Sequence, residues 1–519
     1  MNGATRRGFL ADVGRGMFVA SLGPALAADL GLASAAEGEP EPGRLTFGDL
    51  EPLVSVLQET PADRLLPELV NRLSTGTDLR QLTAAAALAN ARAFGGEHYR
   101  GYHAFMAIAP AFQMARDCPA PRRALPVLKV LHRNTEFIQS TGGGDVLHPI
   151  EAADLADSPA AGTLLREASA AGNVEQAEHV FAAMAEQSPE EMFNDVLEFN
   201  VEDHASVHEV VLVWRAWSLL DLTGREHAHT LLRQSIRQCI DRSAGDYVPD
   251  PRRALMVRLL DEHGLATAPQ GRREADEHWI ESLCDTILSS KPDQAAEAVA
   301  AALAEGFRRE DVGEALSLAA NQLVLRQVEN WEGEHGHGRR THGDSPGVHS
   351  SDAVNAWRNI ARVGSPRSAA AALILAGHFV ASMHCPAGHP RGTGHGGVPF
   401  PHADQIAQVT ATNAESLLKE LDGAVRENDQ LRACAIAERY GSLGHNDRSL
   451  RDALLRFTIS EDGRLHGEKY YRTVSEEYAA ARPAFRRRQL TALARVTASA
   501  YGLGLEDERL GHAPAYEEA

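Results

Sequence analysis

The 519-residue chain contains little cysteine, few aromatic residues and no long apolar run. Its five cysteines are widely scattered and none are spaced as Cys-x-x-Cys, so neither a dense disulfide framework nor a zinc ribbon is indicated. One or two disulfides could form in an oxidising compartment, and the odd number would then leave one thiol over. No segment approaches the roughly 20 apolar residues that a membrane-spanning helix needs. We therefore expect a soluble mature protein without a stable membrane anchor.

Basic residues are scarce relative to acidic ones. The chain has 51 Lys and Arg against 71 Asp and Glu, which gives a formal charge of −20. An acidic surface of this size repels phosphate backbones, and no basic stripe interleaved with aromatic residues offsets it. The composition therefore argues against a nucleic-acid partner.

The motifs of several common enzyme classes are also missing. His208-Glu209 is not followed by a histidine at position 212, so there is no His-Glu-x-x-His zinc motif. No Walker loop, dinucleotide fingerprint or Gly-x-Ser-x-Gly elbow is present, and the glycines at 142–144 lack the Lys-Ser/Thr of a phosphate cradle. Any catalytic site must therefore be sought outside these motifs.

The N-terminus carries paired arginines before a modest apolar region. Thr5-Arg6-Arg7-Gly8-Phe9-Leu10 is followed by a weakly apolar run over 16–28 and by an Ala-x-Ala type cleavage site after Ala35. This stretch resembles a twin-arginine (Tat) export signal, although Ala11 replaces the usual basic residue. The alternative is a disordered tail with a chance Arg-Arg pair. The resemblance implies transport by the Tat translocase, a periplasmic or secreted location, and folding before export, often with a cofactor.

Beyond the expected signal peptide (residues 1–35), composition suggests one large domain. Residues 36–48 are rich in Glu, Pro and Gly and are expected to form a linker. Residues 49–505 are expected to form a single all-α domain, with a possible sub-boundary in the His- and Gly-rich stretch 333–350. Residues 506–519 read as a tail.

The spacing of apolar residues is helical throughout this domain. Ala and Leu recur at intervals of three and four, and strand-like alternation is rare. Gly224, and Gly364 with Pro366, separate neighbouring helical segments into pairs. We predict an all-α fold of stacked helical hairpins, forming an α-solenoid or an α/α toroid-like array. Helices are expected over 79–94, 175–186, 207–222, 228–240, 277–288, 294–304, 312–328, 368–383, 414–421 and 489–500.

The stretch 201–220 suggests a metal site. If it is a single helix, His204 and His208 project from one face one turn apart, with Asp203 and Glu209 beside them. Two imidazoles at this spacing can bind a divalent ion, and the carboxylates could orient them or move protons. The alternative is a solvated or hydrogen-bonded helix start.

Further histidines could reach the same site. His103 follows Tyr102 at the entry to an apolar helix, and His227 opens the helix after the Gly224 turn. His378 lies in an otherwise apolar helix, and His402 ends a His-rich loop. Each could instead be a buried histidine satisfied by a carbonyl group, or a solvated one. The dense stretch 462–472 is expected to serve packing rather than catalysis.

Several short segments carry a family resemblance. The export signal, Gly101-Tyr102-His103, the turn at 224–228 and the segment 402–414 resemble uncharacterised Tat-exported α-helical bacterial proteins. Histidines on Ala- and Leu-rich helices are also similar to the questin-oxidase-like family, whose named members are Baeyer–Villiger-type oxygenases of polyketide pathways. This resemblance implies oxidative chemistry, but the NADPH that cytoplasmic members are thought to use would be missing outside the cell.

Together these observations favour an exported metal-dependent enzyme acting on a small-molecule substrate, most plausibly an oxidoreductase. The expected ligands of a divalent Fe, Cu or Zn ion are His103, His204, His208, His227, His378 and His402. Glu209, Asp203 and Tyr102 are the expected catalytic side chains. The alternatives are a metal-dependent hydrolase and a periplasmic α-repeat binding or scaffold protein without catalysis.

Overall fold

The computed structural model describes residues 43–155, 158, 161–203, 206–243, 250–327, 345–383 and 398–502. By contacts between residues the chain divides into two units, residues 1–46 and residues 47–519. The expected signal peptide, most of the expected linker and the tail lie outside the described residues. All elements discussed below belong to the second unit.

The described residues are almost entirely helical and contain no strand, which confirms the all-α prediction. An isolated bridge joins Arg273 and Phe307. Within these ranges, none of the helices combines the length and apolar character that crossing a bilayer requires. The helices are α3 (Glu51–Glu59), α4 (Ala62–Ser74), α5 (Leu79–Phe94), α6 (Tyr99–Asp117), α7 (Leu125–Ser140), α8 (Ala161–Ala170), α9 (Val174–Ala183), α10 (Pro189–Asp203), α11 (Val207–Thr223), α12 (Ala228–Ser243), α13 (Pro251–Glu262), α14 (Glu277–Ser289), α15 (Pro292–Ala304), α16 (Arg309–Arg326), α17 (Pro346–Val363), α18 (Pro366–Met383), α19 (Ala403–Gln408), α20 (Ala414–Arg426), α21 (Gln430–Ser442), α22 (Asp447–Thr458), α23 (His466–Ala480) and α24 (Pro483–Ala500).

Local side chains fix the ends of these helices. At the start of α5, Asp78 accepts a hydrogen bond from the Arg80 amide, and Gln81 accepts one from the Asp78 amide, which forms a capping box. At its end Gly95 adopts a left-handed conformation with φ +55°, which favours glycine. The helix therefore begins and ends at the predicted residues.

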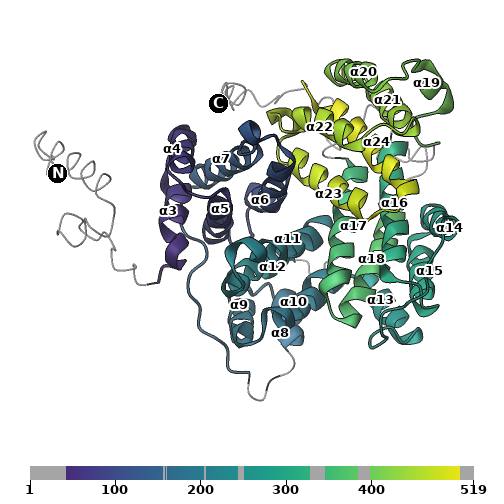
Figure 1. Ribbon diagram of the computed structural model, residues 1–519. Helices are drawn as coiled ribbons and strands as arrows, with labels where there is room; N and C mark the ends of the chain where they lie inside the picture. Colours follow the sequence, from purple (N-terminus) through teal and green to yellow (C-terminus); the bar gives the residue numbers. More distant parts are fainter. Residues whose placement is uncertain are drawn as a thin grey trace, which may run out of the picture. The chain divides into compact units, whose positions relative to one another are not determined.

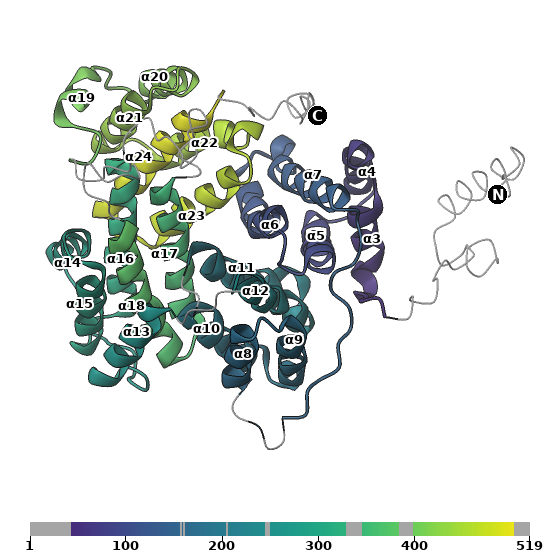
Figure 2. The ribbon, with the colours of Figure 1, turned by 180° about the vertical axis from the view of Figure 1, so that it is seen from behind.

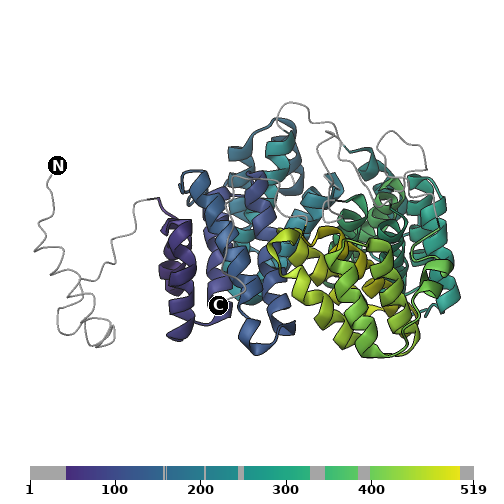
Figure 3. The same cartoon turned by 90° about the horizontal axis from the view of Figure 1, so that it is seen from above.

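Four helical hairpins organise the unit. In each, a helix packs against the next one along the chain: α6 against α7, α11 against α12, α17 against α18, and α23 against α24. We call α6, α11, α17 and α23 the inner helices and their partners the outer helices. The inner helices also contact one another in a closed order, α6 to α11 to α17 to α23 and back to α6. Figures 1 and 2 show these four helices as neighbours from opposite sides, and Figure 3 shows the helices of this unit lying side by side.

Small residues allow the helices to approach closely. A Cβ atom added to Gly347, in the first turn of α17, would lie 2.8 Å from the backbone nitrogen of Val324 in α16. A Cβ added to Gly101 in α6 would lie 2.4 Å from the ring of Phe94 in α5. These contacts set the positions of two inner helices.

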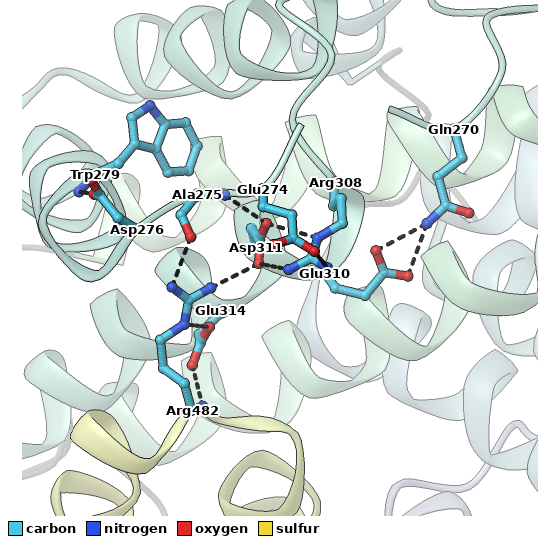
Figure 4. A network of polar contacts seen from close by, with 10 residues as sticks. All are labelled: Gln270, Glu274, Ala275, Asp276, Trp279, Arg308, Glu310, Asp311, Glu314 and Arg482. Atoms are coloured by element: carbon cyan, nitrogen blue, oxygen red, sulfur yellow. Dashed lines mark hydrogen bonds and ion pairs between the residues drawn. The ribbon is translucent and has the colours of Figure 1, made fainter. Parts of the chain in front are cut away.

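A buried polar network fixes the turn between α23 and α24. Arg482 donates from Nε to Glu314 (2.9 Å), from Nη2 to Asp311 (2.8 Å) and from Nη1 to the carbonyl of Ala275 (2.9 Å). Asp311 also accepts from Arg308 and from the Ala275 amide. The guanidinium of Arg482 therefore links the start of α24 to α16 and to the segment before α14 (Figure 4).

Two stretches discussed above are each interrupted, and the helices that follow begin at residues 207 and 414, as predicted. Residues 201–220 form two helices rather than one, because α10 ends at Asp203 and α11 begins at Val207. The hydroxyl of Ser206 donates to Glu209, and this Ser-x-x-Glu pair favours a new helix start. Similarly, residues 402–414 are not one helix, because α19 ends at Gln408 and Asn413 caps α20.

The described cysteines lie in the core. Cys118, Cys239, Cys284 and Cys434 are all buried, and no disulfide joins any two of these four. Cys385 lies outside the described residues.

Candidate functional site

Four histidines, one from each inner helix, meet at one place. The ring centres lie 4.8 Å apart for His103 and His208, 6.0 Å for His208 and His349, 5.7 Å for His349 and His466, and 5.9 Å for His466 and His103. These contacts form a closed loop. We call these four residues the histidine cluster.

The inner helices place these histidines near their N-terminal ends. His466 is the first residue of α23, His208 the second of α11, His349 the fourth of α17 and His103 the fifth of α6. The cap of α17 shows how the sequence achieves this, since Ser345 accepts from the Val348 amide and Pro346 occupies the first helical position.

His103 is the most deeply buried member of the cluster, with 5% of its surface exposed. Its Nδ1 lies 2.7 Å from the carbonyl oxygen of Tyr99, so Nδ1–H donates to that carbonyl. Its buried Nε2 has no hydrogen-bond partner among the described residues. The Tyr99 contact thus fixes the tautomer and leaves the Nε2 lone pair available, the arrangement expected of a metal-ligating histidine.

Burial and nearby positive charge lower the pKa of two cluster histidines, His103 and His466. Burial, followed by the charges of Lys469 and His208, holds the pKa of His103 well below its ordinary value, although the Tyr99 carbonyl opposes the shift. The pKa of His466 is likewise far below its ordinary value because of burial, Lys469 and the other three histidines. At neutral pH both imidazoles are therefore uncharged, which is the form that binds metal ions.

Two tyrosines flank the cluster. The ring of Tyr102 lies 4.9 Å from that of His103 and 5.4 Å from that of His208. Tyr99, which is 62% exposed, lies 4.2 Å from His103, so the cluster borders the surface at this point. Glu209, by contrast, is bonded to Ser206 and accepts a hydrogen bond from Gln238 on α12 (3.3 Å).

The metal hypothesis can be tested against this geometry. Four imidazoles around one tetrahedral ion, with metal–nitrogen distances of about 2.0–2.1 Å, have ring centres roughly 5 Å apart. The observed separations of 4.8 to 6.0 Å are at and somewhat above that value. As the side chains stand, no group of three or more His, Cys, Asp or Glu in the described part of the chain could hold a metal ion. Ligation by the cluster would therefore require the imidazoles to rotate and draw together.

Of the expected metal ligands that lie in the described residues, the structure brings His103 and His208 together. His227 packs edge-on against Phe47 (5.8 Å). His378 on α18 lies 3.4 Å from Asp293. The described contacts of these two histidines are thus with other groups than the cluster.

Of the remaining predicted site residues, one has its described contacts elsewhere, two have side chains outside the described residues and one lies beside the cluster. His402 caps α19 and stacks on Phe400 at 4.5 Å. His204 and the side chain of Asp203 lie outside the described residues. Tyr102 lies beside His103 and His208 of the cluster.

Sequence reasoning missed His349 and His466. His349 was assigned to a flexible loop, but it lies in α17, and His466 was assigned to a packing segment. A usable signal does exist, because each cluster histidine lies in the first two turns of the first helix of a hairpin. A search for histidines at helix starts would have found both.

A cleft of about 330 Å³ lies farther along the same four helices. We call it the arginine cleft, and its lining comes from the C-terminal halves of α6, α11, α17 and α23. Because the histidines gather at the starts of these helices and the cleft at their later turns, the inner helices run in the same direction. Its lining residues are Ala109, Gln113, Trp214, Arg215, Trp217, Ser218, Asp221, Leu222, Arg225, Asn359, Val363, Arg472 and Glu476.

The fold and site define an all-α protein in which four codirectional inner helices, each backed by an outer helix, carry a histidine cluster at their starts. No protein-family model, no curated protein and no solved structure matches this chain.

Proposed function

We propose that the histidine cluster binds a divalent transition metal ion and that the protein is a metal-dependent oxidoreductase acting on a small organic substrate. The observation that carries this proposal is the closed loop of four imidazoles, one from each inner helix. Ligand sites in helical proteins are often built from side chains of facing helices in this way. The ligand set replaces the one expected from the sequence and consists of His103, His208, His349 and His466.

The chemistry of the donors supports iron, copper or zinc, since imidazole suits all three. Four neutral imidazoles leave the charge of the ion uncompensated, so a bound metal would supply strong Lewis acidity or a redox couple. Tyr102 is the buried one of the two tyrosines beside the cluster and is our candidate for moving a proton. We retain Glu209 only as a positioning residue, because its carboxylate is engaged at the start of α11.

We further propose that the chain is exported through the Tat route and acts in the periplasm or outside the cell. The Arg6-Arg7 pair and the following apolar region support this proposal. Export of a folded protein is compatible with a metal inserted beforehand.

Metal analysis of protein purified without a histidine tag tests the proposed site. We expect about one Fe, Cu or Zn ion per chain in the wild type, and its loss in each of the variants His103→Ala, His208→Ala, His349→Ala and His466→Ala. His378→Ala is the matched control and should retain the metal, because its imidazole lies beside Asp293.

Two results would overturn the proposal. One is a wild-type protein that stays metal-free after incubation with each of the three ions. The other is a metal content that falls equally in His378→Ala and in the cluster variants. A metal-free protein would favour the alternative of a helical binding or scaffold protein.

A further inference from the structure

The arginine cleft contains a buried cation without a counter-ion. Arg215 on α11 is 2% exposed, and its Nε has no hydrogen-bond partner among the described residues. No carboxylate in that part of the chain is paired with it. A buried guanidinium is unfavourable unless an anion compensates it, and Arg215 feels the charges of Glu476 and Asp352 without forming an ion pair with a described carboxylate.

The nearest candidate for that role, Glu476 on α23, is already engaged. Its carboxylate pairs with Arg472 and accepts a hydrogen bond from Asn359 (3.1 Å). Burial lowers the pKa of Arg215, and the more distant charges of Glu476 and Asp352 only oppose this shift. The carboxylate of Glu476 therefore serves Arg472 and α17 rather than neutralising Arg215 alone.

Two further donors of the cleft lack an acceptor. The Nε of Arg472 and the indole Nε1 of Trp214 are both buried, and neither has a hydrogen-bond partner among the described residues. Both residues line the same cleft as Arg215. Three N–H groups from two helices thus require an acceptor, and a carboxylate, which accepts through two oxygens, matches guanidinium donors well.

The remaining walls suit an apolar molecular body. Ala109, Trp217, Leu222 and Val363 contribute apolar surface, and the volume of about 330 Å³ falls within the range of small-molecule pockets. The lining carries the cations of Arg215, Arg225 and Arg472 against the carboxylates of Asp221 and Glu476, so a single negative charge balances it and a monoanion matches the cleft better than a dianionic phosphate.

We propose that the arginine cleft binds a small organic monocarboxylate, with its carboxylate on Arg215, Arg472 and Trp214 and its apolar body against Trp217. Arg215 lies seven residues after His208 on α11, so the cleft is about 10 Å along the helix from the histidine cluster. The proposal does not depend on metal binding there.

Direct titration of the full-length protein tests this site. Benzoate is the probe, benzamide is its neutral analogue, and inorganic phosphate is the competing anion class. Binding is measured by calorimetry and by quenching of tryptophan fluorescence. We expect saturable benzoate binding that is at least about tenfold tighter than benzamide binding, since a charge-assisted hydrogen bond is lost with benzamide. We expect inorganic phosphate to bind more weakly than benzoate.

Variants locate the binding. Arg215→Met should weaken benzoate binding at least about tenfold and leave the ligand-free protein as stable as the wild type or more stable, because it removes an unpaired buried charge. Trp214→Phe should weaken binding through loss of one donor. Arg258→Met removes an exposed charge on α13 and should leave benzoate affinity unchanged.

The proposal is overturned if benzoate does not bind, if benzamide binds equally well, or if phosphate binds more tightly at Arg215. It is also overturned if Arg215→Met loses stability but keeps its benzoate affinity, since Arg215 would then have a purely structural role. If Arg215→Met fails to fold, the proposal is tested instead by the benzoate affinity of Trp214→Phe and by the comparison of benzoate with benzamide in the wild type.

Discussion

At the scale of single residues, burial controls which histidines can take up a proton. His229, at the start of α12, stacks on Phe181 with ring centres 4.7 Å apart. Burial, and then the charge of Arg233, lower its pKa from 6.5 to about 4. The folded protein therefore keeps this imidazole neutral over a range of pH in which the unfolded chain protonates it.

The pH dependence of stability should reveal this difference. Between pH 6.5 and pH 4 the unfolded state binds a proton at His229 that the native state does not bind, so acidification destabilises the fold, by up to about 3 kcal/mol. The loss begins as the pH falls below 6.5 and is complete below about pH 4. Denaturant unfolding at several pH values should show that the variant His229→Gln lacks this part of the slope. If the wild type and variant differ by the same free energy at pH 7 and at pH 4.5, this explanation fails.

The sequence predicted only some of the histidines that form the cluster. The chain shows which positions are histidine, but the cluster joins residues separated by more than 100 positions, and helix packing alone decides which of them meet. His103 was recognised because it begins an apolar segment, and His208 because its spacing from His204 suggested a shared helix face. His378 was misjudged because an apolar helix suggests a buried imidazole, whereas its ring lies beside Asp293 near the surface.

At the scale of elements, the sequence was far more informative. The period of Ala and Leu, together with caps such as Asp78 and Gly95, sufficed to place helices such as α5, because these signals are local. The start of α11 at Val207 was predicted, but the preceding helix α10 (Pro189–Asp203) was not. The Ser206 and Glu209 pair is a local signal for the start of α11.

The close contact between α16 and α17 gives a prediction about glycine. In Gly347→Ala the new Cβ would lie 2.8 Å from the backbone nitrogen of Val324, so the helices must move apart. We expect a loss of stability of about 1–3 kcal/mol, measured by denaturant unfolding. Gly423→Ala in α20 is the matched control, since its Cβ meets nothing within 4 Å, and it should gain about 0.5–1 kcal/mol from helix propensity. Equal effects of the two substitutions would contradict the close packing.

At the scale of the whole second unit, the four hairpins must keep fixed positions relative to one another, because the histidine cluster requires the N-terminal ends of the four inner helices to stay close. Arg482 contributes by joining the turn before α24 to Asp311 and Glu314 of α16, whose side chains are 3% and 7% exposed. These contacts connect residues that are 168 or more positions apart, and therefore no local sequence pattern predicts them.

Removing the central guanidinium should be costly. Arg482→Met leaves two buried carboxylates short of a partner and should destabilise the protein by about 3–5 kcal/mol in denaturant unfolding. Arg258→Met is the control, because Arg258 pairs with Glu262 and Glu297 at the surface, and it should cause no measurable loss. A stable Arg482→Met protein would show that the network of Figure 4 does not hold the turn.

The histidine cluster depends on its own residues, on the positions of the inner helices and on the packing of the second unit. X-ray diffraction can test directly whether the cluster binds a metal ion. Crystals of the untagged protein, supplied with the metal that it retains, should give one dominant anomalous peak at the metal absorption edge. The proposed site requires that this peak lie about 2 Å from nitrogen atoms of His103, His208, His349 and His466. A dominant peak elsewhere, or no peak among these four imidazoles, would contradict the assignment of a metal centre to the inner helices.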